Sequence, residues 1–176
     1  YFGSGETKDS VIDNFTVQNG RVYDTGGGAI LCENNSSPTI TNCVFQGNEV
    51  VDTNNSYGPE RGGAIHCDRS NLAIASCVFS NNSVDTDGGA ICCDYGSLMI
   101  TNCTFDGNSA DNNFGGAVHC YKGSLTVSEC RFSGNTSNSG GAICCLEAHS
   151  LTVTNCAFSN NDGGNGAGAI YCWTLG

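Results

Sequence analysis

One short motif recurs along the whole chain and restricts the folds open to it. Gly-Gly-Ala followed by Ile or Val occurs five times, and an altered copy begins at Ala167. The motif returns after roughly 26 residues, a period typical of solenoid proteins. Two residues after each Ile or Val stands a cysteine, which gives the series Cys32, Cys67, Cys93, Cys120, Cys145 and Cys172.

A second motif alternates with the first. Its clearest copy spans residues 39–48, where a cysteine is followed by a phenylalanine two residues later and then by an asparagine. A degenerate copy at 11–17 has Phe15 in place of the cysteine. In both motifs apolar residues occupy every second position, which predicts β-strands. The cysteines of the second motif are Cys43, Cys77, Cys103, Cys130 and Cys156.

These repeats predict an all-β fold, a right-handed parallel β-helix of about six coils with three short strands in each coil. Strands this short are not stable as isolated hairpins, so each should pair in parallel with its copy one coil away. We expect a single domain over residues 1–176. It would consist of a partial N-terminal coil at 1–26, five coils at 27–166 with an insertion at 49–61, and an incomplete last coil at 167–176.

Two series of asparagines recur at expected bends. One precedes the second-motif cysteine, and we expect it to form an internal ladder because an Asn amide can both donate to and accept from its neighbours. The other follows the phenylalanine and is a second candidate ladder. The first series is Asn14, Asn42, Asn102 and Asn155, with Ser76 and Glu129 at the intervening positions; the second runs through Asn48, Asn82, Asn108, Asn135 and Asn161.

Thirteen cysteines in 176 residues favour an oxidising compartment. Five coils carry one cysteine from each motif, and the N-terminal coil lacks both, which favours a disulfide within each coil. The alternative is two columns of buried free thiols, since cysteine packs as a small apolar residue. The candidate pairs are Cys32–Cys43, Cys67–Cys77, Cys93–Cys103, Cys120–Cys130 and Cys145–Cys156.

A further column lies between the Ile/Val and the first-motif cysteine and is expected to face outward. It reads Leu31, His66, Cys92, His119, Cys144 and Tyr171. We expect a mixed exposed face or a patch that a partner covers, and no metal site. The alternative is that the alternating His66, Cys92, His119 and Cys144 form a strip for a soft metal such as zinc or copper.

The chain has a net charge of −11 and only six basic residues, which are scattered. Because nucleic acids and anionic membranes attract clustered Lys and Arg, the sequence argues against both as partners. Its apolar runs are also too short for a membrane span.

The Gly-Gly-Ala-Ile and Phe-x-x-Asn motifs together resemble the paired repeats of chlamydial polymorphic outer membrane proteins, over roughly residues 10–172. The chain also resembles secreted right-handed β-helix repeat proteins. This resemblance implies export and an extracellular or cell-surface location. The families that the chain resembles include adhesins. It names no ligand.

We therefore expect a non-enzymatic structural or adhesive scaffold that associates with itself along the helix axis or belongs to a longer parent chain. A carbohydrate-binding module is the first alternative; it would bind a glycan or host-surface ligand through residues 49–61 and Tyr57, Tyr95 or Tyr121. A polysaccharide lyase or hydrolase is the second. No cofactor is required, although a series of acids could hold calcium: Asp24, Asp52, Asp85 and Asp111. Sequons at Asn34, Asn35, Asn54 and Asn81 are candidate glycosylation sites.

Overall fold

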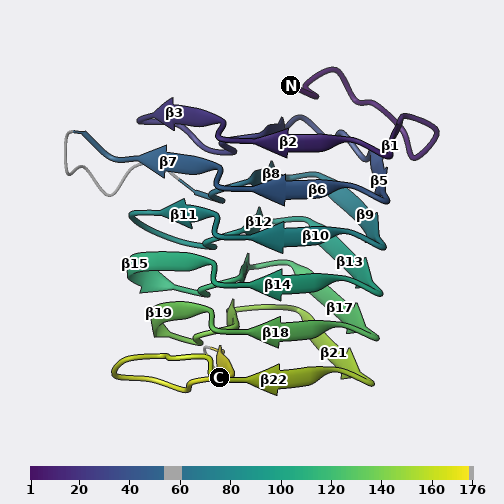
Figure 1. Ribbon diagram of the computed structural model, residues 1–176. Coiled ribbons are helices and arrows are strands. Elements are labelled where there is room, and N and C mark those ends of the chain that lie inside the picture. Colours follow the sequence, from purple (N-terminus) through teal and green to yellow (C-terminus); the bar gives the residue numbers. More distant parts are fainter. Residues whose placement is uncertain (54–60, 175–176) are drawn as a thin grey trace.

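The computed structural model describes residues 1–53 and 61–174, and every regular element in that part of the chain is a β-strand. The strands lie in coils stacked one on another (Figure 1), and equivalent strands of successive coils form four parallel sheets.

Sheet A follows the Gly-Gly pairs and contains β4 (Ile30–Cys32), β8 (Ile65–Asp68), β12 (Ile91–Asp94), β16 (Val118–Tyr121), β20 (Ile143–Leu146) and β23 (Ile170–Trp173). Sheet B contains the next strand of each coil: β1 (Val11–Asp13), β5 (Thr39–Thr41), β9 (Asn71–Ala75), β13 (Ser97–Thr101), β17 (Ser124–Ser128) and β21 (Ser150–Thr154).

Sheet C carries the phenylalanines and contains β2 (Thr16–Gln18), β6 (Val44–Gln46), β10 (Val78–Ser80), β14 (Thr104–Asp106), β18 (Arg131–Ser133) and β22 (Ala157–Ser159). Sheet D contains β3 (Arg21–Tyr23), β7 (Glu49–Val51), β11 (Ser83–Val84), β15 (Ser109–Phe114) and β19 (Thr136–Ser139).

The register places like residues on top of one another. Ile91 pairs with Val118 in sheet A, and Phe79 pairs with Phe105 in sheet C. All these pairs are parallel and join strands one coil apart, so the predicted parallel β-helix is confirmed.

The prediction of three strands per coil was wrong, because sheet D adds a fourth. The strands of sheet D carry few inward apolar side chains, so their sequences show no alternation of apolar and polar residues that would predict a strand. Val50, Val84 and Ala110 form a small buried cluster of their own, with Val22 against it. The predicted insertion at 49–61 therefore begins inside a regular strand, β7, and its residues 54–60 lie outside the described part of the chain.

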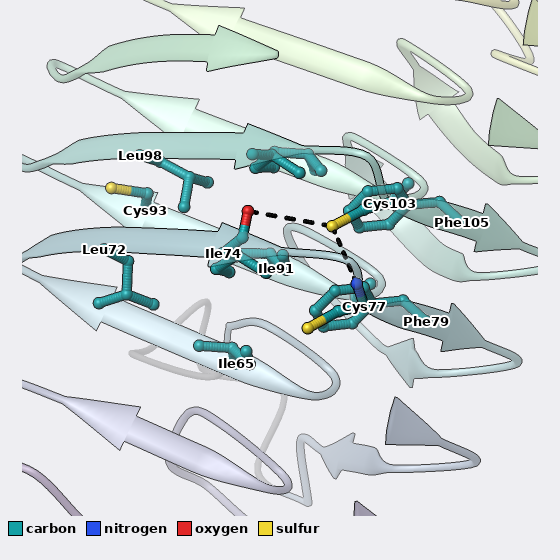
Figure 2. Packing of buried hydrophobic residues seen from close by; sticks show 14 of the residues in the cluster. Ile65, Leu72, Ile74, Cys77, Phe79, Ile91, Cys93, Leu98, Cys103 and Phe105 are labelled. Atoms are coloured by element: carbon teal, nitrogen blue, oxygen red, sulfur yellow. Dashed lines mark hydrogen bonds between the residues drawn. The ribbon is translucent and has the colours of Figure 1, made fainter. Parts of the chain in front are cut away.

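The core is built from columns of identical or similar apolar side chains (Figure 2). The buried phenylalanine rings of sheet C stack nearly parallel, with centroids 4.7 Å apart for Phe105 and Phe132 and 4.9 Å apart for Phe45 and Phe79. Each buried side chain of this size contributes about 1.5–3 kcal/mol, and the contribution repeats in every coil.

The first asparagine series does not form an internal ladder. Asn14, Asn42, Asn102 and Asn155 are exposed and have left-handed backbones, with φ between 52° and 60°. Ser76 and Glu129 occupy the same position in the other coils with φ of 54° and 56°. The position therefore selects for a backbone conformation that Asn tolerates well, and not for an amide ladder.

The second series is the internal ladder. Each Asn Nδ2 donates to the Oδ1 of the next Asn at 2.9 Å, and the same Oδ1 accepts from the backbone N–H of the first Asn at 3.0 Å. Nδ2 also donates to a backbone carbonyl one coil back, for example from Asn108 to Phe79 at 3.1 Å. The ladder satisfies the buried polar groups at the bend between sheets C and D.

Candidate functional site

The column of sheet A that was predicted to face solvent is buried. His66, Cys92, His119 and Cys144 expose 6%, 0%, 2% and 0% of their surface. They point away from the main core, but the chain segment that leads into each Gly-Gly pair lies across them. An exposed mixed face was thus the wrong interpretation of this column.

Two side chains that stand directly before a Gly-Gly pair, Arg61 and Phe114, provide much of this cover. Arg61 reaches the next coil, where its guanidinium contacts Asp87 and Asp94, and the Phe114 ring stacks on the His119 ring with centroids 6.0 Å apart. At the equivalent position, Gly26 has no room for a side chain, because an added Cβ would lie 2.3 Å from Nδ1 of His66. In the sequence, this covering layer is marked by only one position per coil, the residue before the Gly-Gly pair. A single position has no alternating neighbours, so a period of two could not reveal it.

The buried layer holds a compact set of ion pairs. Arg61 Nη1 donates to Asp94 Oδ2 at 2.7 Å, and its Nε lies 3.6 Å from Asp87 Oδ2. His66 Nε2 lies 3.2 Å from the same Oδ2 of Asp94, and the Cys92 thiol donates to Oδ1 at 3.7 Å. Asp87 Oδ1 also accepts from the backbone N–H of Phe114 at 3.2 Å.

Burial and neighbouring groups shift the pKa values of Asp94 and His119 in this layer. Burial disfavours the charged form of Asp94, but the hydrogen bond from His66 and the charge of Arg61 outweigh it, and the pKa of Asp94 is lowered. Burial lowers the pKa of His119, so its imidazole stays neutral at physiological pH. Nδ1 of His119 is buried and has no hydrogen-bond partner.

This layer opens to solvent through a pocket of about 320 Å³. Arg61, His66 and Asp94 form part of its lining, and Tyr95 and Tyr121 stand beside it with their rings edge to face, 5.5 Å apart. Glu33 and Asp68 complete the described lining. The pocket combines aromatic edges with carboxylates, which suits a small polar ligand or a sugar. Tyr57, also predicted for glycan binding, lies outside the described residues.

The predicted disulfides within coils are not confirmed: the thirteen cysteines carry free thiols. A whole strand of sheet B separates the two cysteines of a coil, and Figure 2 shows Cys93 and Cys103 on opposite sides of Leu98. The affected pairs are Cys32–Cys43, Cys67–Cys77, Cys93–Cys103, Cys120–Cys130 and Cys145–Cys156.

The second-motif cysteines instead contact one another along their own column. The backbone N–H of Cys77 donates to Sγ of Cys103 at 3.3 Å, and the Cys77 thiol donates to the Ala75 carbonyl at 3.2 Å. Burial raises the pKa of Cys32 to about 12, which keeps it a thiol. These contacts fit the alternative interpretation, two columns of packed thiols.

Three of the four acids proposed for calcium, Asp24, Asp85 and Asp111, accept hydrogen bonds from the protein itself. Both carboxylate oxygens of Asp24 accept from Thr53, Oδ2 of Asp85 accepts from the backbone of Asp52 at 2.8 Å, and Asp111 accepts from Ser109. Among the described residues, these acids do not come together as a group able to hold a metal; His66, Cys92 and Asp94 do.

Three of the four candidate glycosylation sites are on described residues. Asn34, Asn35 and Asn81 are exposed with left-handed backbones, whereas Asn54 lies outside the described part. Glycosylation of these sites stays a prediction.

Comparison with known families agrees with this architecture. The model of the right handed beta helix region matches residues 4–132. The chain belongs to this family. A Chlamydia polymorphic membrane protein repeat matches residues 129–146 of this β-helix protein, a stretch that includes Phe132, Asn135 and one Gly-Gly-Ala-Ile copy, so the resemblance stated from the motifs is confirmed. No curated protein and no solved structure matches the chain. In the described residues, no helix is long and apolar enough to cross a membrane.

Proposed function

We propose that this β-helix protein is a non-enzymatic scaffold displayed at a cell surface or outside the cell, where it acts by binding and spacing. One observation carries the proposal: the coils repeat in register throughout sheets A, B and C, and sheet D departs from register only between β15 and β19. The same core residue type recurs at each level, and short polar side chains such as Ser and Thr face solvent in sheet B. Enzymes of extended repeat folds need a local departure from such regularity to assemble a reacting centre.

The location rests on the family repeat and the composition. The repeat that matches residues 129–146 is named for a membrane protein of Chlamydia, and the chain is acidic with few basic residues. A surface rich in Ser, Thr and Asn suits a protein that is exposed to solvent along its whole length.

The test measures binding and turnover together. The purified protein is incubated with a panel of neutral and uronic-acid polysaccharides, with and without calcium, and with cells or matrix-coated surfaces. We expect adhesion to a subset of surfaces and no change in polymer length. Release of shortened or unsaturated products would overturn the non-enzymatic proposal.

We also propose self-association along the helix axis, because a further β-helix coil would continue the same parallel ladders in register. Sedimentation velocity over a hundredfold concentration range tests it, with electron microscopy of the same samples. Species that lengthen in one dimension are expected, and a constant monomer would contradict the proposal.

The pocket between sheet A and its covering layer supports carbohydrate binding as the second candidate. Tyr95 is half exposed beside Tyr121, and Glu33 and Asp68 offer carboxylates to sugar hydroxyls. A glycan array comparing the wild type with Tyr95→Ala tests it, with Met99→Ala, an exposed apolar residue of sheet B, as the matched control. Signals lost only in Tyr95→Ala would support this function; equal signals in both variants, or none in the wild type, would end it.

A further inference from the structure

Three side chains of the buried layer bring metal-ligating atoms together. The ligand atoms of His66, Cys92 and Asp94 all lie within 4.8 Å of one another, and each residue is at most 6% exposed. They come from two neighbouring strands: β8 supplies His66, and β12 supplies Cys92 and Asp94. The register pairs Cys92 with His66, so their side chains leave sheet A on the same face.

A fourth donor stands next to this group. His119 pairs with Cys92 on the following strand, β16, and is 2% exposed. Its Nδ1 is the one buried side-chain nitrogen or oxygen among the described residues without a hydrogen-bond partner. A buried polar atom left unpaired costs about 1–3 kcal/mol, so a native protein normally gives such an atom a partner.

The charges of the layer also favour a cation. Counted with neutral imidazoles and a protonated Cys92, Arg61 contributes one positive charge, and Asp87 and Asp94 contribute two negative ones. A divalent ion that binds Cys92 as thiolate adds two positive charges and one negative charge, which brings the layer to neutrality. The displaced thiol proton leaves to solvent through the pocket that Arg61, His66 and Asp94 line.

We propose that this layer is a binding site for a zinc-class divalent cation. Its ligands are Nε2 of His66, Sγ of Cys92 and Oδ1 of Asp94, with the imidazole of His119 as the fourth. Oδ2 of Asp94 keeps its hydrogen bond to Arg61, which then holds the carboxylate in place from outside the ligand set.

The donor set and spacing suit zinc better than calcium. Calcium takes oxygen ligands, whereas nitrogen and sulfur donors select zinc and related metals. Zinc lies about 2.0–2.3 Å from such donors, so atoms up to 4.8 Å apart need only small side-chain movements to reach one ion. This compact site differs from the strip considered from the sequence, because it does not include Cys144. Cys144 lies two coils from Cys92, too far to bind the same ion.

Cobalt(II) spectroscopy of the intact chain tests the proposal. Because Cys172 is exposed, the reference protein carries Cys172→Ser to remove adventitious metal binding by that thiol. The two variants described below carry the same substitution. We expect one Co²⁺ per chain, a thiolate-to-cobalt charge-transfer band, and intense visible bands typical of four-coordination. Zn²⁺ should displace the cobalt and abolish these bands.

Cys92→Ser should lose the charge-transfer band and bind cobalt at least about tenfold more weakly. The matched control is Cys144→Ser, a buried thiol of the same column that should leave the band unchanged. Equal bands in the two variants, or no band in the reference protein, would overturn the site.

A second measurement keeps the proposal testable if Cys92→Ser does not fold. His66→Gln and His119→Gln are compared with the reference for the rise in unfolding temperature on adding Zn²⁺ and its reversal by a chelator. A rise in the reference that is reduced in both variants supports the site. A rise of the same size in all three proteins, or no rise in the reference, contradicts it.

Discussion

The two asparagine columns of this β-helix occupy similar places in the sequence but do different work in the structure. The column through Asn108 is buried, and each amide there makes hydrogen bonds to the coils on both sides. The column through Asn102 is exposed, and its shared property is a left-handed backbone. The first column allows only Asn at its buried levels, whereas the second accepts Ser76 and Glu129. Substitution tolerance therefore reports whether a side chain or a backbone angle is being selected.

The largest difference between the columns should come from adding a charge. Asn108→Asp places a carboxylate where Nδ2 now donates to Asn135 Oδ1 and Phe79 O, so the free energy of unfolding should fall by about 4 kcal/mol at pH 7. Burial raises the pKa of such a carboxyl above its ordinary value of about 3.9, so the loss should shrink as the pH falls toward that value.

The measurement is urea unfolding of the variant and the wild type at matched pH values, which removes the contribution of other carboxylates. Asn102→Asp is the control and should stay within about 0.5 kcal/mol of the wild type throughout. Equal losses at the two positions would show that burial does not separate the columns.

Asn108→Ala should cost somewhat less, about 3 kcal/mol, because no charge is buried. It leaves the backbone N–H and the Nδ2 of Asn82 without their acceptor and removes the donor to Phe79. Chemical denaturation checks this value. A loss below 1 kcal/mol would mean that water replaces the amide, and the ladder would then not be essential.

In the exposed column the backbone angle should dominate. Asn102→Ala should lose about 1 kcal/mol because alanine is strained at a φ of 53°, whereas Asn102→Gly should change stability by less than about 0.5 kcal/mol. Thermal unfolding of both variants measures the difference. If glycine proved as damaging as alanine, the side-chain contacts of Asn102 would be its main contribution.

The smallest effect should be a gain. Glu129 has a φ of 56° in the exposed column, and Glu129→Asn should raise the free energy of unfolding by about 0.5–1 kcal/mol. Glu129→Gln removes the same charge without relieving the backbone, so it should show no such gain. A gain of equal size in both variants would assign the effect to charge.

Much of the fold could be predicted from spacing alone. The columns that contain Ile91, Phe105 and Cys93 lie where the period of two and the repeat placed them. The candidate site could be predicted only in part. His66, Cys92 and His119 were identified as one column, but Asp94 was not connected to them and Arg61 was seen only as the end of an insertion.

The sequence by itself determined the coil, its repeat and the residues that stack, because identical residues at a fixed period can all be buried only by lying on one another. The tertiary structure decided which polar columns are buried: the Asn108 column at a bend enclosed by sheets C and D, and the His66 column beneath Arg61, Asp87 and Phe114. Burial of a polar side chain depends on what packs against it from another coil or layer, and the period of a single column carries no information on that contact.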